Sequence, residues 1–483
     1  MSELTETFEV ATEVTPAHLN ELLEFIFRRY LLPNQQYFEN INRITVEGYG
    51  VLTFTLVEPR GRGYVNVELW ARKPILLRMT PSDETLPGKI LHRLREDIII
   101  NIQFFEEEVR GKTIYFSWRE GEEVVPEKVM AAGKRATGKI FSDSMLPLFL
   151  IFLSLNFFIF IIFGYLAPLI LVVFQLIIIF FSDRIMARLG EWTVSQKNPI
   201  IHILQYQLPK KEYMAFRQRF GIDQLVKIKQ EIYKKTLAIG EELNCRTAQE
   251  TFLKYGLDCN LENMSTKKVD VYRLVKEAAG RFNLPVPRII ISNTMLPNAA
   301  ATGVSPSHGA ILITTGLITQ LEEEEVLSVL GHEFSHLRGR DPLTLFALST
   351  SEYLFRAYVL FPLIFTLPRL VFFFQLIYFP IVMGAIYFVG KFLEARADLE
   401  SAIKIGQPKV LAEALRKIGF RRLKFERMPA YRAQMWIAWN PHPPTYFRIE
   451  RLEKMETPVD ERNPLLRSIK DVVNGFVKAL SPS

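Results

Sequence analysis

Five consecutive residues, His332-Glu333-Phe334-Ser335-His336, combine the side chain types from which a hydrolytic metal site is built. On an α-helix, positions i and i+4 share one face, so both imidazoles would reach one metal ion. Glu333 would then be placed to take a proton from the water that the metal activates. Because the chain has only 7 histidines, chance assembly of this pattern is improbable. The alternative interpretation is a surface helix with fortuitous histidines.

A third metal ligand is needed, because a catalytic zinc ion usually binds three protein side chains and keeps one position open. The segment Glu394-Ala395-Arg396-Ala397-Asp398 follows the last apolar stretch and offers carboxylates. A carboxylate here would close the site, and Asp398, one helical turn on, would orient an imidazole from behind. Taken alone, Glu394 and Asp398 are more typical of surface carboxylates near a helix end. Their weight comes from the combination with the two histidines.

The residues around the His-Glu motif predict the helix that must position it. Glu322 to Glu325 favour the positive N-terminal end of a helix, and Asp341-Pro342 predicts its end or a kink. We therefore expect residues 322–342 to form one helix with the motif in its second half.

The composition places this helix in a protein that is partly embedded in lipid. The 483 residues are 49% hydrophobic and 23% charged, with a formal net charge of +7. Such a chain is too apolar to be mainly disordered. A basic body beside apolar segments favours anionic lipid headgroups over nucleic acid, for which no binding motif is present. Two cysteines, Cys245 and Cys259, exclude a disulfide scaffold.

The first apolar segment, residues 145–181, has no charged residue before Asp183. A single helix of that length would be about 55 Å long, against a hydrocarbon core of roughly 30 Å. Gly164 and Pro168 lie near its middle, so we predict a hairpin of two spans, 145–163 and 166–181. One tilted or kinked span is the alternative.

A second apolar segment runs over residues 343–392. Its first half contains Glu352 and Arg356, which are four residues apart and would pair on one helix face. A turn at Pro368-Arg369 would lead to a second span at 370–390. The alternative for the first half is a buried or interfacial helix.

Basic residues on the flanks predict the orientation of both hairpins. They are Lys128, Lys134, Arg135 and Lys139 before the first hairpin, and Arg184 and Arg188 after it. The two turns carry only Arg369. The distribution predicts a multi-pass protein of the plasma or inner membrane, with both termini and the large soluble segments in the cytoplasm.

The soluble segments add two parts of unknown role. Residues 1–140 read as a small α+β domain, because Leu19, Leu22, Leu23 and Ile26 share a helix face and two alternating runs flank Gly61-Arg62-Gly63. Residues 190–265 read as a helical, basic insertion. The remaining parts are a metallopeptidase core at 266–342 and its C-terminal portion at 393–483.

Four motifs in order resemble the HtpX-like integral-membrane zinc peptidases, whose relatives include the CAAX prenyl endoprotease. Besides the His332–His336 motif, the segment 298–303 resembles the family's stretch before its substrate-binding edge strand, here residues 310–314. Glu394 to Asp398 resembles the third-ligand motif, and His442-Pro443-Pro444 with Arg448 resembles a late His-Pro-Pro motif. The resemblance covers residues 270–455 and the two hairpins. The 140 residues ahead of the first hairpin and the segment 190–265 depart from the family's usual form.

The resemblance implies a fold, a cofactor and residue roles. The fold would be an α+β membrane protein with a mostly helical zincin-type domain, a small sheet and four spans. One Zn²⁺ per chain would be bound by His332, His336 and Glu394, with Glu333 as general base and Asp398 behind the ligands. His442 would stabilise the oxyanion. Four residues would contact substrate: Asn298, Ala310, Leu312 and Arg448.

The implied activity is hydrolysis of peptide bonds in membrane proteins or unfolded polypeptides, as part of protein quality control. A processing protease for one lipidated or membrane-anchored substrate is the alternative enzyme. An inactive membrane scaffold or chaperone is the alternative from another class, although binding alone would not need Glu333. A zinc transporter is disfavoured, because its ligands should lie within the spans.

Overall fold

The computed structural model describes residues 5–57, 63–82, 88–121, 146–257, 259–303 and 305–480. Its contacts divide the chain into two compact units, Met1–Val124 with Ile201–Lys268, and Val125–Ile200 with Val269–Ser483. Most of the described chain is helical, beside small sheets, which confirms the fold expected from the sequence at this level. The predicted turn residues Gly61 and Arg62 lie outside the described residues, as do Lys128, Lys134, Arg135 and Lys139.

The first unit contains an antiparallel sheet in the order β1-β5-β4-β3-β2. Its strands are β1 (Glu6–Val10), β2 (Phe38–Val46), β3 (Tyr49–Val57), β4 (Tyr64–Trp70) and β5 (Ile75–Pro81). The alternation read from the sequence falls on β3 and β4, where Leu52, Phe54, Val65, Val67 and Leu69 are buried. Helices α1 (Leu19–Ile26) and α2 (Gly88–Arg110) contribute their apolar faces to the same core.

The segment 190–265 contributes strands to the molecule as well as the expected helices. Strand β8 (Ile200–Gln207) pairs antiparallel with β6 (Thr113–Arg119), in a sheet with β9 (Met264–Asp270). Residues 201–207 are all buried, which suits a continuous β-prone run rather than a solvated basic helix. Helices α7 (Lys210–Arg219), α8 (Ile222–Lys235) and α9 (Cys245–Lys254) follow. The description of this segment as a helical insertion is therefore too simple, because β8 joins it to the N-terminal part through backbone hydrogen bonds.

The second unit is built around a four-stranded sheet in the order β11-β12-β10-β7. The strands are β7 (Trp192–Val194), β10 (Arg288–Ser292), β11 (Ala299–Gly303) and β12 (Gly309–Thr314). Strand β12 runs parallel to β10 and antiparallel to β11. Its isoleucines and those of β10 are fully buried. Helix α12 (Glu323–Gly339) packs on β11 and on α10 (Val271–Phe282), and α11 (Thr315–Gln320) follows β12.

The predicted edge strand is wrong. Residues 310–314 form β12, which lies inside the sheet, and the strand at the edge is β11. Ala310 is fully buried and Leu312 is paired on both sides, so neither offers backbone groups to a substrate. The sequence concealed β11 because a run of alanines has low strand propensity, whereas residues 310–314 are β-prone.

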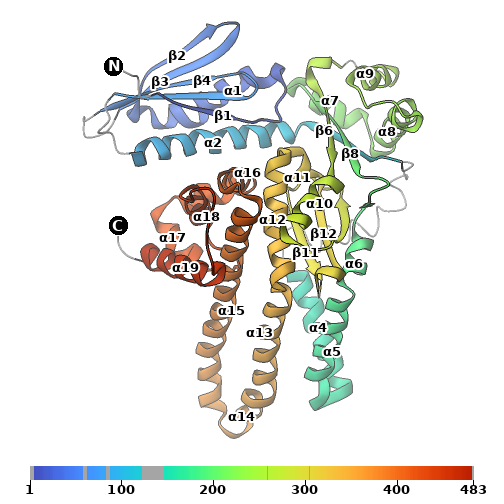
Figure 1. The fold of residues 1–483 in the computed structure, drawn as a ribbon, viewed down its shortest axis with the longest axis vertical. Helices are drawn as coiled ribbons and strands as arrows, with labels where there is room; N and C mark the ends of the chain where they lie inside the picture. The colour runs from blue at the N-terminus through green and yellow to red at the C-terminus, as the bar shows by residue number, and fades with distance from the viewer. Residues whose placement is uncertain are drawn as a thin grey trace. The chain divides into compact units, whose positions relative to one another are not determined.

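The two apolar segments form helical hairpins in the second unit (Figure 1). In the first, α4 (Leu146–Phe163) and α5 (Ala167–Phe180) are joined by a short turn at Gly164–Leu166, followed by α6 (Ser182–Leu189). Gly164 has φ +51°, a conformation that glycine adopts without strain. In the second, α13 (Asp341–Phe355) and α14 (Phe361–Thr366) lead to α15 (Pro368–Ile405). Glu352 and Arg356 pair as expected, at 3.0 Å.

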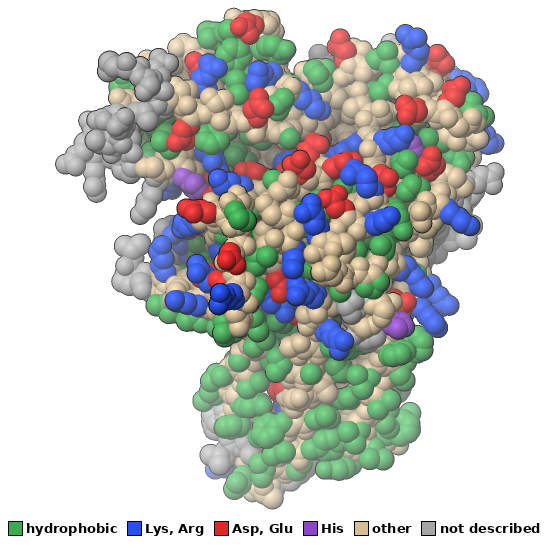
Figure 2. Space-filling model, in the orientation of Figure 1, with side chains coloured by type: hydrophobic (Ala, Val, Ile, Leu, Met, Phe, Trp, Pro, Cys, Tyr) green, Lys and Arg blue, Asp and Glu red, His purple; other side chains and the backbone are tan. Residues whose placement is uncertain are grey.

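Two stretches of the described chain are long and apolar enough to span a membrane, judged by length and composition. They are Ser154–Phe180 and Leu376–Ile405, with mean hydropathies of 2.8 and 1.8. Figure 2 shows hydrophobic side chains gathered over the end of the molecule where the hairpins lie. Large side chains there are openly exposed, for example Phe157 at 63% and Ile377 at 65%. In water such a surface would be unstable, so it fits an apolar environment.

The C-terminal part is entirely helical among its described residues. It comprises α16 (Pro408–Glu426), α17 (Pro429–Ile437), α18 (Thr445–Glu453) and α19 (Pro464–Leu480). Helices α16 and α18 pack on each other, and α19 packs on α15. This arrangement brings the loop before α18, which contains His442, next to the C-terminal half of α15.

Candidate metal centre

Helix α12 carries the His-Glu motif in its last two turns, as the sequence predicts. A reciprocal capping box between Glu322 and Glu325 starts the helix, and Lys417 on α16 pairs with Glu325 at 2.7 Å. His332 and His336 lie on one face, with their rings 4.7 Å apart. Their Nε2 atoms are separated by 3.1 Å.

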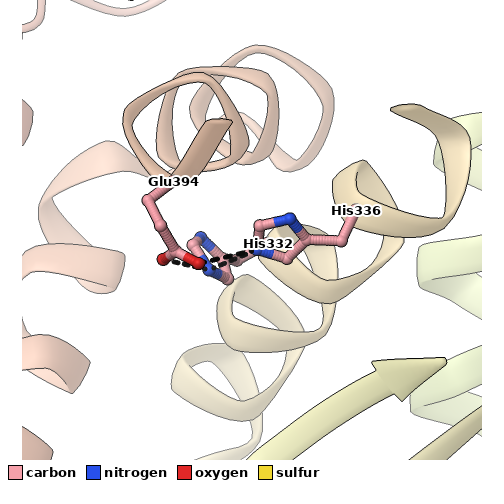
Figure 3. A group of neighbouring side chains, drawn as sticks. All are labelled: His332, His336 and Glu394. Carbon is pink, nitrogen blue, oxygen red and sulfur yellow. Dashed lines mark hydrogen bonds and ion pairs between the residues drawn. The ribbon is translucent and has the colours of Figure 1, made fainter. Parts of the chain in front are cut away.

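Helix α15 crosses close to α12 and brings the third donor. The approach depends on two glycines of α12, since a Cβ on Gly331 would lie 2.6 Å from Ile405 and one on Gly339 would overlap Arg396. A hydrogen bond of 2.8 Å from the Ser401 hydroxyl to the Ser328 carbonyl joins the two helices. At the level of the histidines, α15 presents Glu394 (Figure 3).

Glu394 completes a group of three donors that fits a tetrahedral metal ion. Its two carboxylate oxygens lie 3.4 Å from Nε2 of His332 and 3.4 Å from Nε2 of His336. All three donor side chains offer atoms within 4.8 Å of one another. With metal–ligand bonds of about 2.1 Å, the edge of a tetrahedron is about 3.4 Å. Two imidazoles and a carboxylate at these separations suit zinc, so the residues fit the implied cofactor.

Each histidine is held from behind by a carboxylate, and each carboxylate by an arginine. Asp398 Oδ1 lies 2.9 Å from Nδ1 of His332, and Arg448 donates two hydrogen bonds of 2.7 Å to Asp398. This places Asp398 where the sequence predicted an orienting residue. A carboxylate at Nδ1 keeps the proton there and leaves Nε2 as the donor atom for a metal.

The second orienting carboxylate, Asp341, was missed by the sequence analysis as a functional residue. Asp341 Oδ2 lies 2.7 Å from Nδ1 of His336, and Arg396 binds the same carboxylate at 2.6 Å. The sequence marked Asp341 only as a helix end. The helix break lies between the two contacting residues, because Arg340 adopts the left-handed conformation at φ 53° and Asp341 is the first residue of α13. An Asp five residues after the second His, directly before Pro, is the signal that was available.

The carboxylates around the two imidazoles favour positive charge at this place. Burial alone would lower the pKa of His336, but the hydrogen bonds and charges of Asp341 and Glu394 raise it to about 10. Burial alone would also lower the pKa of His332. The contacts with Asp398 and Glu394 outweigh burial, so the pKa of His332 is raised as well. A cation bound between the Nε2 atoms would meet the same electrostatic demand.

Glu333 lies between the metal-binding group and the edge of the sheet. It is 9% exposed, and its Oε2 accepts a hydrogen bond of 2.8 Å from the backbone N–H of Ala301 on β11. The backbone N–H of Ala301 therefore points away from β12. Because the direction of the backbone groups alternates along a strand, the N–H and carbonyl of Ala299, two residues earlier, face the same open edge. A peptide paired with β11 would pass the Glu333 carboxylate.

The remaining predicted site residues take different positions. His442 reaches the group directly: its Nδ1 lies 2.8 Å from Glu394 Oε2, and its side chain is 44% exposed. Arg448 uses its Nε and one Nη for Asp398, and its other Nη is 3.9 Å from Glu394. Asn298 anchors the start of β11 through its backbone, which binds Thr314 in both directions, while its side chain is exposed.

Lys391 was not singled out from the sequence, yet it fixes the loop that carries His442. The lysine is 1% exposed and donates to the carbonyls of Ala438 and Asn440. A Cβ on the neighbouring Gly390 would lie only 2.8 Å from Pro441, so glycine allows the loop to pack closely on the helix here. A lysine at the end of an apolar span is commonplace in sequence, so only its burial reveals this role.

Residues 265–456 match the model of Peptidase family M48. This part of the chain is therefore similar to the peptidases of this family, which confirms the resemblance to HtpX-like metallopeptidases recognised from the motifs. Two proteins named Protease HtpX homolog, from Burkholderia cenocepacia (strain HI2424) and Burkholderia multivorans (strain ATCC 17616 / 249), are each 47% identical to this chain over 72 residues. The match covers 15% of this chain and only 25% of each relative. A crystal structure of S. mikatae Ste24p aligns with this chain over 75% of this chain and 74% of the Ste24p chain. The sequence identity is 14% and the TM-score is 0.35.

Proposed function

We propose that the chain is a membrane-embedded, zinc-dependent endopeptidase that hydrolyses membrane or misfolded proteins at the cytoplasmic membrane surface. The observation that carries this proposal is the group formed by His332, His336 and Glu394, with Glu333 between that group and an open sheet edge. Metal ligands, a general base and a strand that can pair with a peptide are the parts that peptide hydrolysis requires.

The residues of the chain have separate tasks in this reaction. Zinc, when bound by the two histidines and Glu394, would polarise the scissile carbonyl and activate the attacking water. Glu333 would accept the proton of that water on its carboxylate and deliver it to the leaving amide nitrogen. Asp398 and Asp341 would keep the imidazoles fixed in orientation. The Nδ1 of His442 contacts Glu394 Oε2, so its exposed ring would donate a second hydrogen bond, from Nε2 to the oxyanion, in the imidazolium form, in which both ring nitrogens carry a proton.

The edge strand β11 supports a broad rather than a narrow substrate range. Its residues 299–302 are three alanines and a threonine, which provide no deep side-chain pocket. A peptide added to this edge would be held by backbone hydrogen bonds, which do not depend on its sequence. Such binding suits protein quality control better than the processing of one substrate.

The membrane location is supported by the position of Glu394 on α15. The helix is continuous from Pro368 to Ile405, so the apolar half and the metal ligand belong to one rigid element. At about 1.5 Å per residue, Glu394 lies only about 6 Å beyond Gly390, where the apolar stretch was predicted to end. A site at this height would meet substrates that emerge from the bilayer.

Four spans with a cytoplasmic catalytic domain can be tested by labelling single cysteines in intact cells. In a background without Cys245 and Cys259, we expect Leu166→Cys to react with an impermeant reagent from outside. Glu241→Cys and Asp460→Cys should react only after the cells are opened. Labelling of Glu241→Cys from outside would mean that the first apolar segment crosses once.

The activity is tested by incubating the detergent-purified chain with an unfolded casein. We expect cleavage that phenanthroline abolishes and added zinc restores, with Glu333→Gln as the inactive control. Cleavage confined to a lipidated or membrane-anchored peptide would favour the processing protease. A zinc-loaded chain that cleaves neither substrate would contradict the proposal and favour a scaffold.

A further inference from the structure

Helix α19 (Pro464–Leu480) has two apolar faces, and among the residues that the structure describes only one of these faces is buried against other helices. On the first face, Val472 is fully buried and Phe476 contacts Phe388 at 5.2 Å and Trp436 at 6.1 Å. On the second face, Leu466 is 62% exposed, Val473 41% and Leu480 51%. These three residues, here named the apolar stripe, repeat every seven residues and so lie along one line of the helix.

The flank of the apolar stripe is polar and basic. Arg467, Lys470 and Lys478 follow on the side of the helix away from the protein core, together with exposed Asn474. The single acidic residue of the helix, Asp471, pairs with Arg451 at 2.8 Å and with Arg467 at 3.2 Å, so the basic flank rests mainly on Lys470 and Lys478. An apolar line bordered by cations is the pattern of a helix that lies in the headgroup region of an anionic bilayer.

The second unit exposes further apolar side chains at and just beyond the end of α17. Ile437 and Trp439, at the end of α17, are 61% and 51% exposed. The ring of Trp439 meets that of Phe379 at 6.0 Å, and Phe379 belongs to the candidate span Leu376–Ile405. The exposed apolar surface of α15 therefore continues onto α17, which in turn packs on α19. Tryptophan is a residue typical of membrane–water interfaces.

The direction of α19 agrees with such a position. Figure 1 shows α19 running crosswise to α15 rather than along it. If α15 spans the bilayer, a helix in this direction runs along the membrane surface. The contact of α19 with Phe388 lies nine residues along α15 from Phe379, which corresponds to about 13 Å. The apolar stripe is thus found near the end of the span, where headgroups begin.

We propose that α19 and Trp439 form an interfacial anchor that binds the surface of a bilayer containing anionic lipids. The proposal relies on the membrane embedding of α15 put forward above, and it adds a lipid contact outside the spans. Arg451 gives the anchor a role in the site, because it binds Asp471 and Ser468 of α19 and also the carbonyl of Ala395. Ala395 is the neighbour of Glu394, so the anchor would hold the metal centre at a fixed height above the lipid.

The test uses the full chain in nanodiscs of phosphatidylcholine with a minority of phosphatidylglycerol. The photoreactive amino acid benzoylphenylalanine replaces Val473 in the apolar stripe, Asn474 beside it as the matched control, or Ile377 as a reference within the span. After illumination, mass spectrometry identifies lipid adducts, and gel electrophoresis identifies cross-linked copies of the chain. We expect lipid adducts at 473 and 377 and their loss at 474.

Each other outcome has a distinct meaning. Adducts at 377 without adducts at 473 would overturn the anchor and leave the membrane-embedded peptidase intact. A cross-linked dimer through 473 would show that a second copy covers the apolar stripe, which also overturns the anchor. Absence of lipid at both positions would overturn the membrane embedding itself. Unchanged zinc content of each variant shows that the substitution has not unfolded the chain.

Discussion

Asp341 contacts Nδ1 of His336 at 2.7 Å although it lies in the next helix. The left-handed residue Arg340 interrupts the helical conformation between them, so the first residue of α13 supplies the orienting group for a ligand near the end of α12. The carboxylate is 3% exposed and is itself held by Arg396. The position of Asp341 is therefore set by the break between α12 and α13.

The first prediction concerns this contact. Asp341→Asn should lower the affinity for zinc about 10- to 100-fold, because the amide binds Nδ1–H less strongly and orients the ring less firmly. Zinc affinity can be measured by competition with a chromogenic chelator. The matched control is Glu324→Gln, an exposed position near the start of α12. Equal affinities in the two variants would remove Asp341 from the support of the site.

The second prediction concerns the ligands themselves. The purified chain should contain one zinc ion, and His332→Ala, His336→Ala or Glu394→Gln should each lower the zinc content and abolish proteolysis. Elemental analysis of the purified variants measures this directly. His308→Ala, which changes an exposed histidine, serves as the control. Full zinc retention in Glu394→Gln would mean that another group is the third ligand.

The third prediction separates chemistry from metal binding. Glu333→Gln should keep its zinc and its thermal stability but lose about 3 to 5 kcal/mol of transition-state stabilisation, equivalent to a loss of roughly 10²–10⁴ in kcat. The glutamine still accepts the hydrogen bond from Ala301 through its carbonyl oxygen, so the local structure should persist. A near-normal rate in this variant would show that Glu333 is not the base.

The fourth prediction concerns His442. If its ring donates to the oxyanion, His442→Phe should lower kcat by about 10²–10³ and leave zinc content unchanged. His442→Gln retains an N–H donor and should lose less activity. Steady-state kinetics on a fluorogenic peptide would measure both variants. A raised KM with unchanged kcat would instead identify a binding or structural residue, and Arg448 would be the next candidate.

The fifth prediction concerns the edge strand. Ala299→Pro removes an N–H from the open edge of β11 and should raise KM for every substrate tested, since the lost bond is to substrate backbone. Ala299→Val changes the side chain at the same position and keeps the N–H, so it is the matched control. An effect restricted to one substrate sequence would favour the processing protease.

The chemistry of this protein was readable because helical spacing is a local property. His332 and His336 share a face by the geometry of a single helix, and Glu333 lies between them for the same reason. Apolar runs are equally local, so Gly164 and Pro368 could be identified as the sites of turns. The helix ends at Gly339, within three residues of the predicted boundary, because Asp341-Pro342 cannot continue it.

Relationships between distant segments were decided by the tertiary structure. Which strand lies at the edge depends on pairing across the sheet, and the half-buried alanines of β11 gave no local sign of it. The contacts of Asp341 depend on the helix break at Arg340 and on the close approach of α15, and those of Lys391 depend on the loop before α18 packing on α15. Sequence spacing determines which residues share one helix face, whereas long-range packing determines which of those faces meet.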